Sequence, residues 1–177
     1  MKMKQLTAGM IALVMSMSLP MTTYAADWDL EKGSITVDAG DSGQTVTQGS
    51  TSTPDEAPVV TQRDSSAETS NTITINASEN ATANVTIKDI NIKSSNDAID
   101  VTGSSSANIT LEGDNKIFSE TGSALHISDG NVTINGSGSL KAEIQDDLGI
   151  DYNYSAKIGS HKNEDNPYYR RCNRKNR

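Results

Sequence analysis

One five-residue pattern occurs three times in the chain, as Asn84-Val85-Thr86-Ile87-Lys88, Asn108-Ile109-Thr110-Leu111-Glu112 and Asn131-Val132-Thr133-Ile134-Asn135. The first residues of these segments are 24 and 23 positions apart. Within each segment apolar and polar side chains alternate, which is typical of a β-strand with one buried face. A fixed period of this length, with several short strands in each period, indicates a solenoid.

Two further apolar series support the same architecture. The first consists of Ile73-Thr74-Ile75, Ala98-Ile99-Asp100-Val101 and Ala124-Leu125-His126-Ile127, with Ala156-Lys157-Ile158 as a degraded fourth member. The second consists of the single apolar positions Ile92, Ile117 and Leu140, one after each copy of the five-residue pattern. The sequence therefore predicts an all-β fold, a parallel β-helix of about three to four short coils.

Stacked coils also predict which residues of neighbouring coils lie on top of one another. Val85, Ile109 and Val132 would point inward together, and the threonines that follow them would point outward. Two other architectures use short strands. A β-sandwich needs no fixed period of recurring residue types, and a leucine-rich repeat needs Leu where this chain has mostly Val and Ile. The parallel β-helix fits best, with these two as alternatives.

The N-terminus predicts export. Residues 1–25 combine two lysines, an apolar run and the small residues Thr23 and Ala25, which is the layout of a signal peptide. We expect cleavage between Ala25 and Ala26, and a secreted or cell-surface protein. The apolar run is shorter than a membrane span and contains Ser and Thr, so we do not expect the protein to span a membrane.

Three further segments follow the signal peptide. Residues 26–70 are rich in turn residues and predict an irregular N-terminal coil or cap. Trp28 would cover the end of the core there, with stacking on a sugar as the alternative. Residues 71–160 carry the β-helix repeats, of 23–26 residues each, and residues 161–177 form a basic tail that we expect to be disordered.

Charge and cysteine content limit the function. The 177 residues carry a formal net charge of −8, and residues 26–160 hold 7 basic and 21 acidic side chains, a net charge of −14. Binding to nucleic acid needs clustered Lys and Arg, so we do not expect a nucleic-acid partner. The single cysteine, Cys172, excludes an internal disulfide and a Cys-rich metal site.

Residues 27–160 resemble the N-terminal part of bacterial, clostridial-type surface proteins that contain a carbohydrate-binding domain. The stretches that carry the resemblance are Trp28 to Val37, Ser70 to Ile75, Ala83 to Ile92, Ala107 to Asn115, Ala124 to Ile127 and Val132 to Leu140. The resemblance implies a right-handed parallel β-helix similar to that of pectate lyases. It also implies a non-catalytic module that binds a polysaccharide of acidic, pectin-like type.

The end of the chain departs from this family. Such proteins carry Ala-Gly-Ile-Gly-Gly where this chain reads Ala156-Lys157-Ile158-Gly159-Ser160, and then continue with further coils. The charge of the chain also changes sign in residues 161–177. We therefore expect residues from about 167 onward to be an out-of-frame translation of a lost coil. A basic tail that binds an anionic cell wall is the alternative.

Acidic loop residues are the candidate metal ligands. Ca²⁺ binds carboxylate and carbonyl oxygens, and the candidates for such a site are Asp97, Asp100, Asp114 and Asp129. The resemblance implies that Ca²⁺ would help to bind an acidic polysaccharide. The alternative is solvated surface charge that deters pairing of strand edges.

No motif for nucleotide binding, zinc proteolysis or thiol chemistry occurs in the sequence. His126 occupies a polar position of a strand, where a solvent-facing role is favoured over a catalytic one. We therefore expect no enzyme activity. A structural or adhesive surface protein without a defined sugar ligand is one alternative. A polysaccharide lyase or hydrolase is another, with Arg63 and the pair Asp146-Asp147 as its only suggestive residues.

Overall fold

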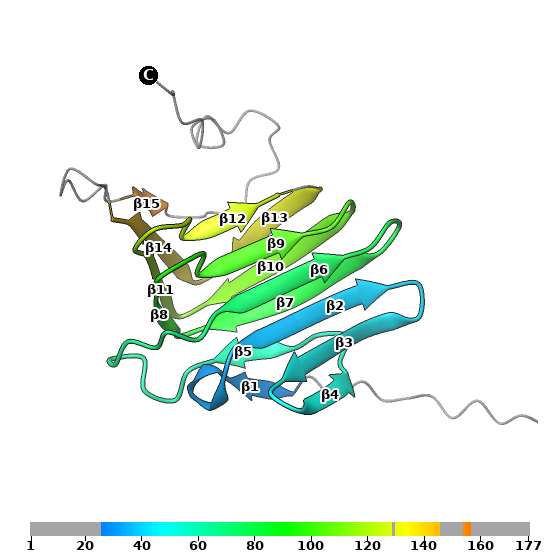
Figure 1. Cartoon of the computed structure of the whole chain (residues 1–177), viewed down its shortest axis with the longest axis horizontal. Coiled ribbons are helices and arrows are strands. Elements are labelled where there is room, and N and C mark those ends of the chain that lie inside the picture. The colour runs from blue at the N-terminus through cyan, green and yellow to red at the C-terminus, as the bar shows by residue number, and fades with distance from the viewer. Residues whose placement is uncertain (1–25, 129, 146–153, 157–177) are drawn as a thin grey trace, which may run out of the picture.

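The structure is a computed structural model that describes residues 26–128, 130–145 and 154–156 (Figure 1). The predicted signal peptide in residues 1–25 and the predicted tail in residues 161–177 lie outside these ranges. The described chain is all-β, with parallel stacked coils that form a β-solenoid of about three turns. The predicted fold class is therefore confirmed.

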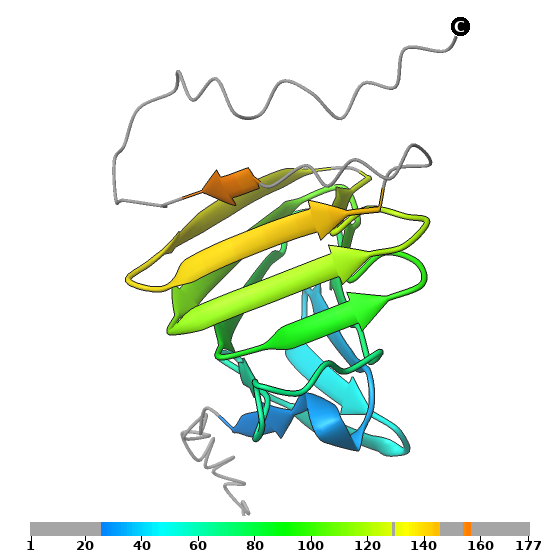
Figure 2. The same cartoon turned by 90° about the vertical axis from the view of Figure 1, so that its left-hand side faces the viewer.

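Each coil passes through three sheets in the same order. The repeating strands are β7 (Thr82–Lys88), β8 (Asn91–Ser94), β9 (Ile99–Thr102), β10 (Ser106–Glu112), β11 (Asp114–Ser119), β12 (Leu125–Ile127), β13 (Asn131–Gly136) and β14 (Ser139–Ile144). Sheet A has the order β1-β5-β7-β10-β13, sheet B the order β12-β9-β6-β2-β3-β4, and sheet C the order β15-β14-β11-β8. Figure 2 shows β8, β11 and β14 of sheet C side by side.

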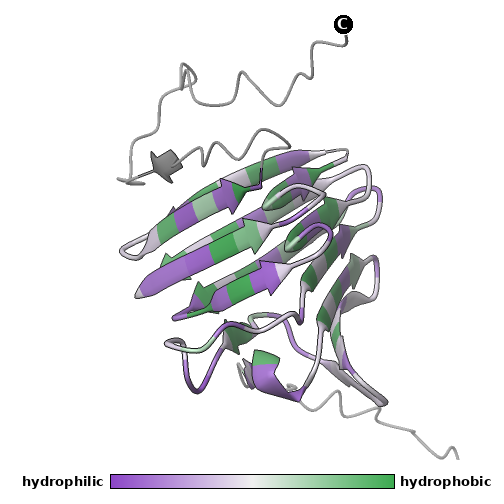
Figure 3. Ribbon diagram, turned by 60° about the vertical axis from the view of Figure 1, so that its left-hand side comes forward, coloured by the Kyte–Doolittle hydropathy of each residue, from purple (hydrophilic) through white to green (hydrophobic). Residues whose placement is uncertain are grey.

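Alternating side chains build the core between the three sheets. Along the strands green apolar and purple polar residues alternate, as the two-residue period of a strand requires (Figure 3). The inward residues stack from coil to coil, for example Ile73 on Ile99 in sheet B and Ile92 on Ile117 in sheet C. These four side chains are 0–1% exposed. Each buried aliphatic side chain of this size contributes roughly 1.5–3 kcal/mol to folding.

The N-terminal end of the core is covered by short strands, a 3₁₀ turn and loops. Its elements are β1 (Asp27–Asp29), the 3₁₀ turn η1 (Leu30–Lys32), β2 (Ile35–Gly40), β3 (Gly43–Gln48), β4 (Thr51–Pro54), β5 (Val59–Thr61) and β6 (Ile73–Ala77). β3 pairs antiparallel with β2 and with β4, so sheet B ends in antiparallel strands. Trp28 is 8% exposed and belongs to the core cluster, which places the indole inside the cap rather than on a sugar-binding surface.

The register of the third coil differs from the prediction by two residues. Ile134, not Val132, lies opposite Ile109, and Ala142, not Leu140, lies opposite Ile117. A two-residue shift leaves every side chain on the same face, so the alternating pattern alone cannot distinguish the two registers.

The turn before β13 fixes this register. Four steps of chain lead from Ile127 to Asn131, against five from Val101 to Ser106, so β13 begins opposite the start of β10. Gly130 permits the short turn because its φ is 81° and a β-carbon at this position would collide with the carbonyl oxygen of Ser105.

The predicted fourth member of the sheet B series is wrong. β15 (Tyr154–Ala156) pairs antiparallel with β14 in sheet C, instead of continuing sheet B in parallel with β12. The parallel stacking of the described strands therefore ends with β12, β13 and β14.

Candidate functional site

The outer face of sheet C gathers an aromatic ring and several charged side chains. β8, β11 and β14 are in register, so their outward residues form two rows across the strands. One row consists of Asn91, Lys116 and Lys141, and the other of Lys93, Phe118 and Glu143. Phe118 is the only phenylalanine in the chain. The inward residues between these rows, Ile92 and Ile117, anchor the strands in the core.

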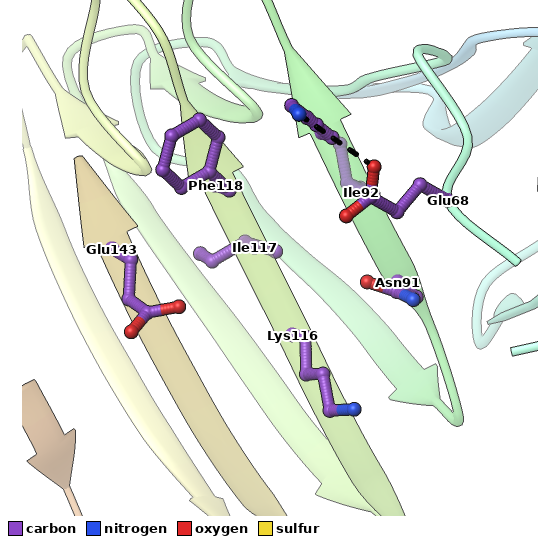
Figure 4. A pocket seen from close by; sticks show the side chains of 8 residues that line it. Glu68, Asn91, Ile92, Lys116, Ile117, Phe118 and Glu143 are labelled. Carbon is purple, nitrogen blue, oxygen red and sulfur yellow. Dashed lines mark ion pairs between the residues drawn. The ribbon is translucent and has the colours of Figure 1, made fainter. Parts of the chain in front are cut away.

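An open cavity of about 240 Å³ lies over these rows, and we name it the sheet C cavity. Figure 4 shows Phe118 and Lys116 on the central strand β11, with Glu143 on one side and Asn91 on the other. Glu68 reaches the cavity from the loop between β5 and β6. The cavity therefore combines residues from one loop and from three neighbouring strands of sheet C.

Ion pairs fix several of these side chains but leave one cation free. Lys93 Nζ lies 3.8 Å from Glu68 Oε2 and 5.7 Å from the centroid of the Phe118 ring. Lys141 Nζ lies 2.8 Å from Glu143 Oε1. In the described part of the chain, Lys116 forms no ion pair. Among the described residues, the ammonium group of Lys116 is thus available to a ligand from solution, whereas the cation beside the Phe118 ring is that of Lys93.

The lysines also concentrate positive charge on this face. The described residues contain six lysine and arginine side chains, and three of them, Lys93, Lys116 and Lys141, lie in the two rows of sheet C. The same residues carry many more acidic groups, and two of these, Glu68 and Glu143, also line the sheet C cavity. Half of the described Lys and Arg side chains thus lie on sheet C, which favours an anionic ligand on this face.

A second cluster lies on the outer face of sheet B. His126 and Asp100 are directly opposite each other on β12 and β9, and His126 Nδ1 lies 2.8 Å from Asp100 Oδ1. Asp97, from the turn before β9, places its Oδ2 at 3.7 Å from the same Nδ1. The backbone N–H of Ser123 donates to Asp97 Oδ1, at 2.5 Å, and orients that carboxylate. Ligand atoms of the three residues all lie within 4.8 Å of one another.

The structure brings together two of the four predicted calcium ligands. Asp97 and Asp100 share the sheet B cluster, while Asp114 begins β11 in sheet C and accepts a hydrogen bond from Ser139 Oγ at 2.8 Å. Asp129 lies outside the described residues. His126 was not among the predicted ligands, although it and Asp100 occupy matching places in the apolar series that starts at Ile73, which could have indicated it.

The imidazole changes the chemistry of this cluster. Ca²⁺ prefers oxygen ligands, whereas an imidazole nitrogen with two carboxylates suits divalent first-row transition ions such as Zn²⁺ or Mn²⁺. Each of the three side chains is about one-third or more exposed, at 33% for the two aspartates and 43% for His126. The cluster is therefore accessible from solvent.

Of the residues of the enzyme alternative, only Arg63 lies in the described part of the chain. Arg63 Nη2 lies 3.2 Å from Asp29 Oδ2 at the N-terminal end, and the pair Asp146-Asp147 lies outside the described residues. Within the described ranges, no helix has the length and apolar character needed to cross a membrane. Comparison with protein-family models, with curated proteins and with solved structures found no match to this chain.

Proposed function

We propose that this protein is an exported, non-catalytic module that binds an acidic polysaccharide through the sheet C cavity. The observation that carries the proposal is that Phe118 and Lys116 line the same cavity from one strand of an otherwise acidic protein, and that Lys116 has no ion-pair partner among the described residues. The aromatic ring offers an apolar surface, and the flanking amide and charged groups offer hydrogen bonds. Such a combination suits a sugar that has an apolar ring face and polar edges.

The solenoid favours a polymer over a single sugar. Neighbouring strands lie about 4.8 Å apart, so the rows of sheet C present polar groups at short, regular intervals. A chain of linked uronate units can contact several of these groups at once, and each further contact becomes intramolecular after the first. Weak individual contacts on an open face then add up to useful affinity.

Binding to polygalacturonate and to an uncharged polysaccharide tests the proposal. We expect Phe118→Ala and Lys116→Glu each to weaken binding to the acidic polymer by about tenfold, which corresponds to about 1.4 kcal/mol. Lys88→Glu on sheet A is the matched control, since Lys88 pairs with Glu112 outside the cavity. Added salt should weaken binding by the wild-type protein.

Two outcomes would contradict this function. Equal binding by wild type and both cavity variants would remove sheet C as the site. Absence of binding to every polysaccharide would favour a structural or adhesive surface protein. A release of reducing ends or unsaturated products from the polymer would instead favour the lyase or hydrolase alternative.

The cation dependence of binding is tested separately. If Ca²⁺ bridges the polymer and the protein, as the resemblance implies, a chelator weakens binding, and Asp100→Asn reproduces that loss if the polymer extends from the sheet C cavity to the cluster on sheet B. Asp114→Asn is the matched control, because Asp114 lies in sheet C and outside the cluster with His126. Titration with Zn²⁺ beside Ca²⁺ shows which ion the three side chains prefer.

A further inference from the structure

A buried carboxylate at the N-terminal end lacks a cationic partner. Asp55 is 1% exposed, and its Oδ2 accepts hydrogen bonds from Trp28 Nε1 at 2.9 Å and from the backbone nitrogen of Ala26 at 3.1 Å. Its Oδ1 accepts from the backbone nitrogen of Ala57 at 3.1 Å. Among the residues that the structure describes, no Lys, Arg or His forms an ion pair with Asp55.

Such an arrangement is costly without a counter-charge. A carboxylate that leaves water loses its hydration, and hydrogen bonds from neutral donors replace that hydration only in part. Buried charges in proteins are therefore normally paired. Among the described residues, one atom bonded to Asp55 can acquire a positive charge, the nitrogen of Ala26.

Ala26 is held beside Asp55 by residues that follow it in the chain. Its carbonyl oxygen accepts a hydrogen bond from the backbone nitrogen of Val59 at 3.0 Å. The next residues, β1, pair in parallel with β5, with Asp27 opposite Val59. These contacts with β5 fix the position of the Ala26 nitrogen beside Asp55.

We propose that hydrolysis of the Ala25–Ala26 peptide bond creates the missing partner, with the new α-ammonium group of Ala26 binding the carboxylate of Asp55. A signal peptidase would catalyse the step, and water would be the co-reactant. The oxygen of water joins the carbonyl carbon of Ala25 as that residue leaves as a carboxylate. Both protons of water end on the nitrogen of Ala26, which is an ammonium group at neutral pH.

The ion pair gives processing a structural consequence. In the precursor the Ala26 nitrogen is a neutral amide with one hydrogen, and after cleavage it is a charged group with three. Charge-assisted hydrogen bonds are stronger than neutral ones, so cleavage would lock β1 and Trp28 onto the end of the core. The inference rests on the proposed export and on its cleavage site.

The test compares two chains that differ by one residue at the N-terminus. One runs from Ala26 to Arg177 and the other from Ala25 to Arg177, and both contain every described residue. Each is released from an N-terminal ubiquitin fusion, which leaves no extra residue. We expect the thermal midpoint of the Ala26 chain to be higher by about 3–6 °C, since its amine reaches Asp55 and the amine of the longer chain does not.

Asp55→Asn should abolish this difference, while Asp27→Asn, an exposed acidic neighbour, should preserve it. Equal midpoints of the two unsubstituted chains would overturn the proposal, and so would a difference that persists in Asp55→Asn. If Asp55→Asn does not fold, the chemical reactivity of the N-terminal amine in the two unsubstituted chains provides the test instead. An amine-directed acetylating reagent at neutral pH should modify Ala26 at least tenfold more slowly than Ala25, and equal rates would overturn the proposal.

The cleavage site itself is tested apart from the ion pair. Mass spectrometry of the exported protein should find Ala26 as the first residue. A different first residue would contradict the predicted processing and the proposal with it. Loss of polysaccharide binding would bear only on the sheet C cavity, because the cavity and Asp55 share no residue.

Discussion

The two ends of the solenoid differ in how well they cover the apolar core. At the N-terminal end Trp28, Leu30 and Val46 are buried, and the antiparallel strands β3 and β4 extend sheet B beyond the parallel strands. At the other end two inward residues of the last strands are exposed to water. Ile127 is 36% exposed and Ile144 is 40% exposed.

Polar side chains complete the closed end. Gln44 Nε2 donates to the carbonyl oxygens of Asp55 and Asn84, at 2.8 and 3.0 Å, and its Oε1 accepts from the backbone nitrogen of Asn84 at 2.8 Å. Gln48 likewise donates to the carbonyl oxygens of Asp29 and Gly33, each at 2.8 Å. These amides satisfy backbone groups that a further coil would otherwise bind.

The difference in burial between the two ends can be followed along one stack of inward side chains. Val85 and Ile109 are each 2% exposed, whereas Ile134, the next member, is only partly buried. Each coil of a solenoid is stabilised by contact with its neighbours. A terminal coil has one neighbour and therefore contributes less to the free energy of folding than a central coil. The following predictions test this gradient.

The largest effect is expected from a charge in the central rung. Ile109→Asp should abolish cooperative folding, because the carboxylate would be buried between β7 and β13 without a partner, at a cost of several kcal/mol. Circular dichroism and thermal unfolding measure the loss. Thr110→Asp, its outward neighbour, is the control and should stay folded; a folded Ile109→Asp protein would contradict the stacking.

The next largest loss of stability is expected from removal of the indole of Trp28. Trp28→Ala should lower the free energy of unfolding by about 3–5 kcal/mol, because it opens a cavity in the cap and removes the hydrogen bond to Asp55. Urea unfolding measures this change. A loss below about 1 kcal/mol would show that the cap adds little to the core.

Truncation to alanine compares the stability that two residues of this stack contribute. Ile109→Ala should cost about 2–5 kcal/mol, and Ile134→Ala clearly less, because Ile134 is already partly hydrated in the folded state. Chemical denaturation of both variants gives the two values. Equal losses would mean that the terminal rung is as well packed as the central one.

Polar substitutions at the open end should change stability least. Ile127→Ser and Ile144→Ser should alter the free energy of unfolding by about 0.5 kcal/mol or less, since both side chains are already exposed. Exposed apolar residues beside strand edges favour association, so both variants should lower the tendency to self-associate. Sedimentation velocity over a range of concentrations measures it, and unchanged association would exclude these residues from any contact.

The smallest effect concerns the pH response of the closed end. In the loop after β5, the hydroxyl and then the backbone N–H of Ser66 donate to Asp64 and lower the pKa of that carboxyl. The folded pKa lies below the unfolded one, so the contribution is present above the unfolded pKa and is lost as pH falls through the folded pKa. Ser66→Ala should raise the pKa of Asp64 toward its ordinary value in an NMR titration. Ser65→Ala, the control, should not.

Much of the fold follows from local pattern. The alternation in the three copies of the five-residue pattern predicted strands with one buried face, and β7, β10 and β13 have that form. The fixed period predicted parallel stacking, because equal lengths of chain return each strand to its neighbour. Both inferences depend on spacing along the chain, which the sequence states directly.

The details of stacking and of the sites depend on tertiary structure. Two registers of β13 bury the same face, and only the length and geometry of the turn at Gly130 decide between them. The partner of His126 is a residue 26 positions away, and the acceptor for Ala26 is 29 positions away. The sequence by itself determined the strands, their inward faces and their order. Only the folded chain decided the register, the sheet C cavity and the burial of Asp55, because each depends on where separate rungs meet in space.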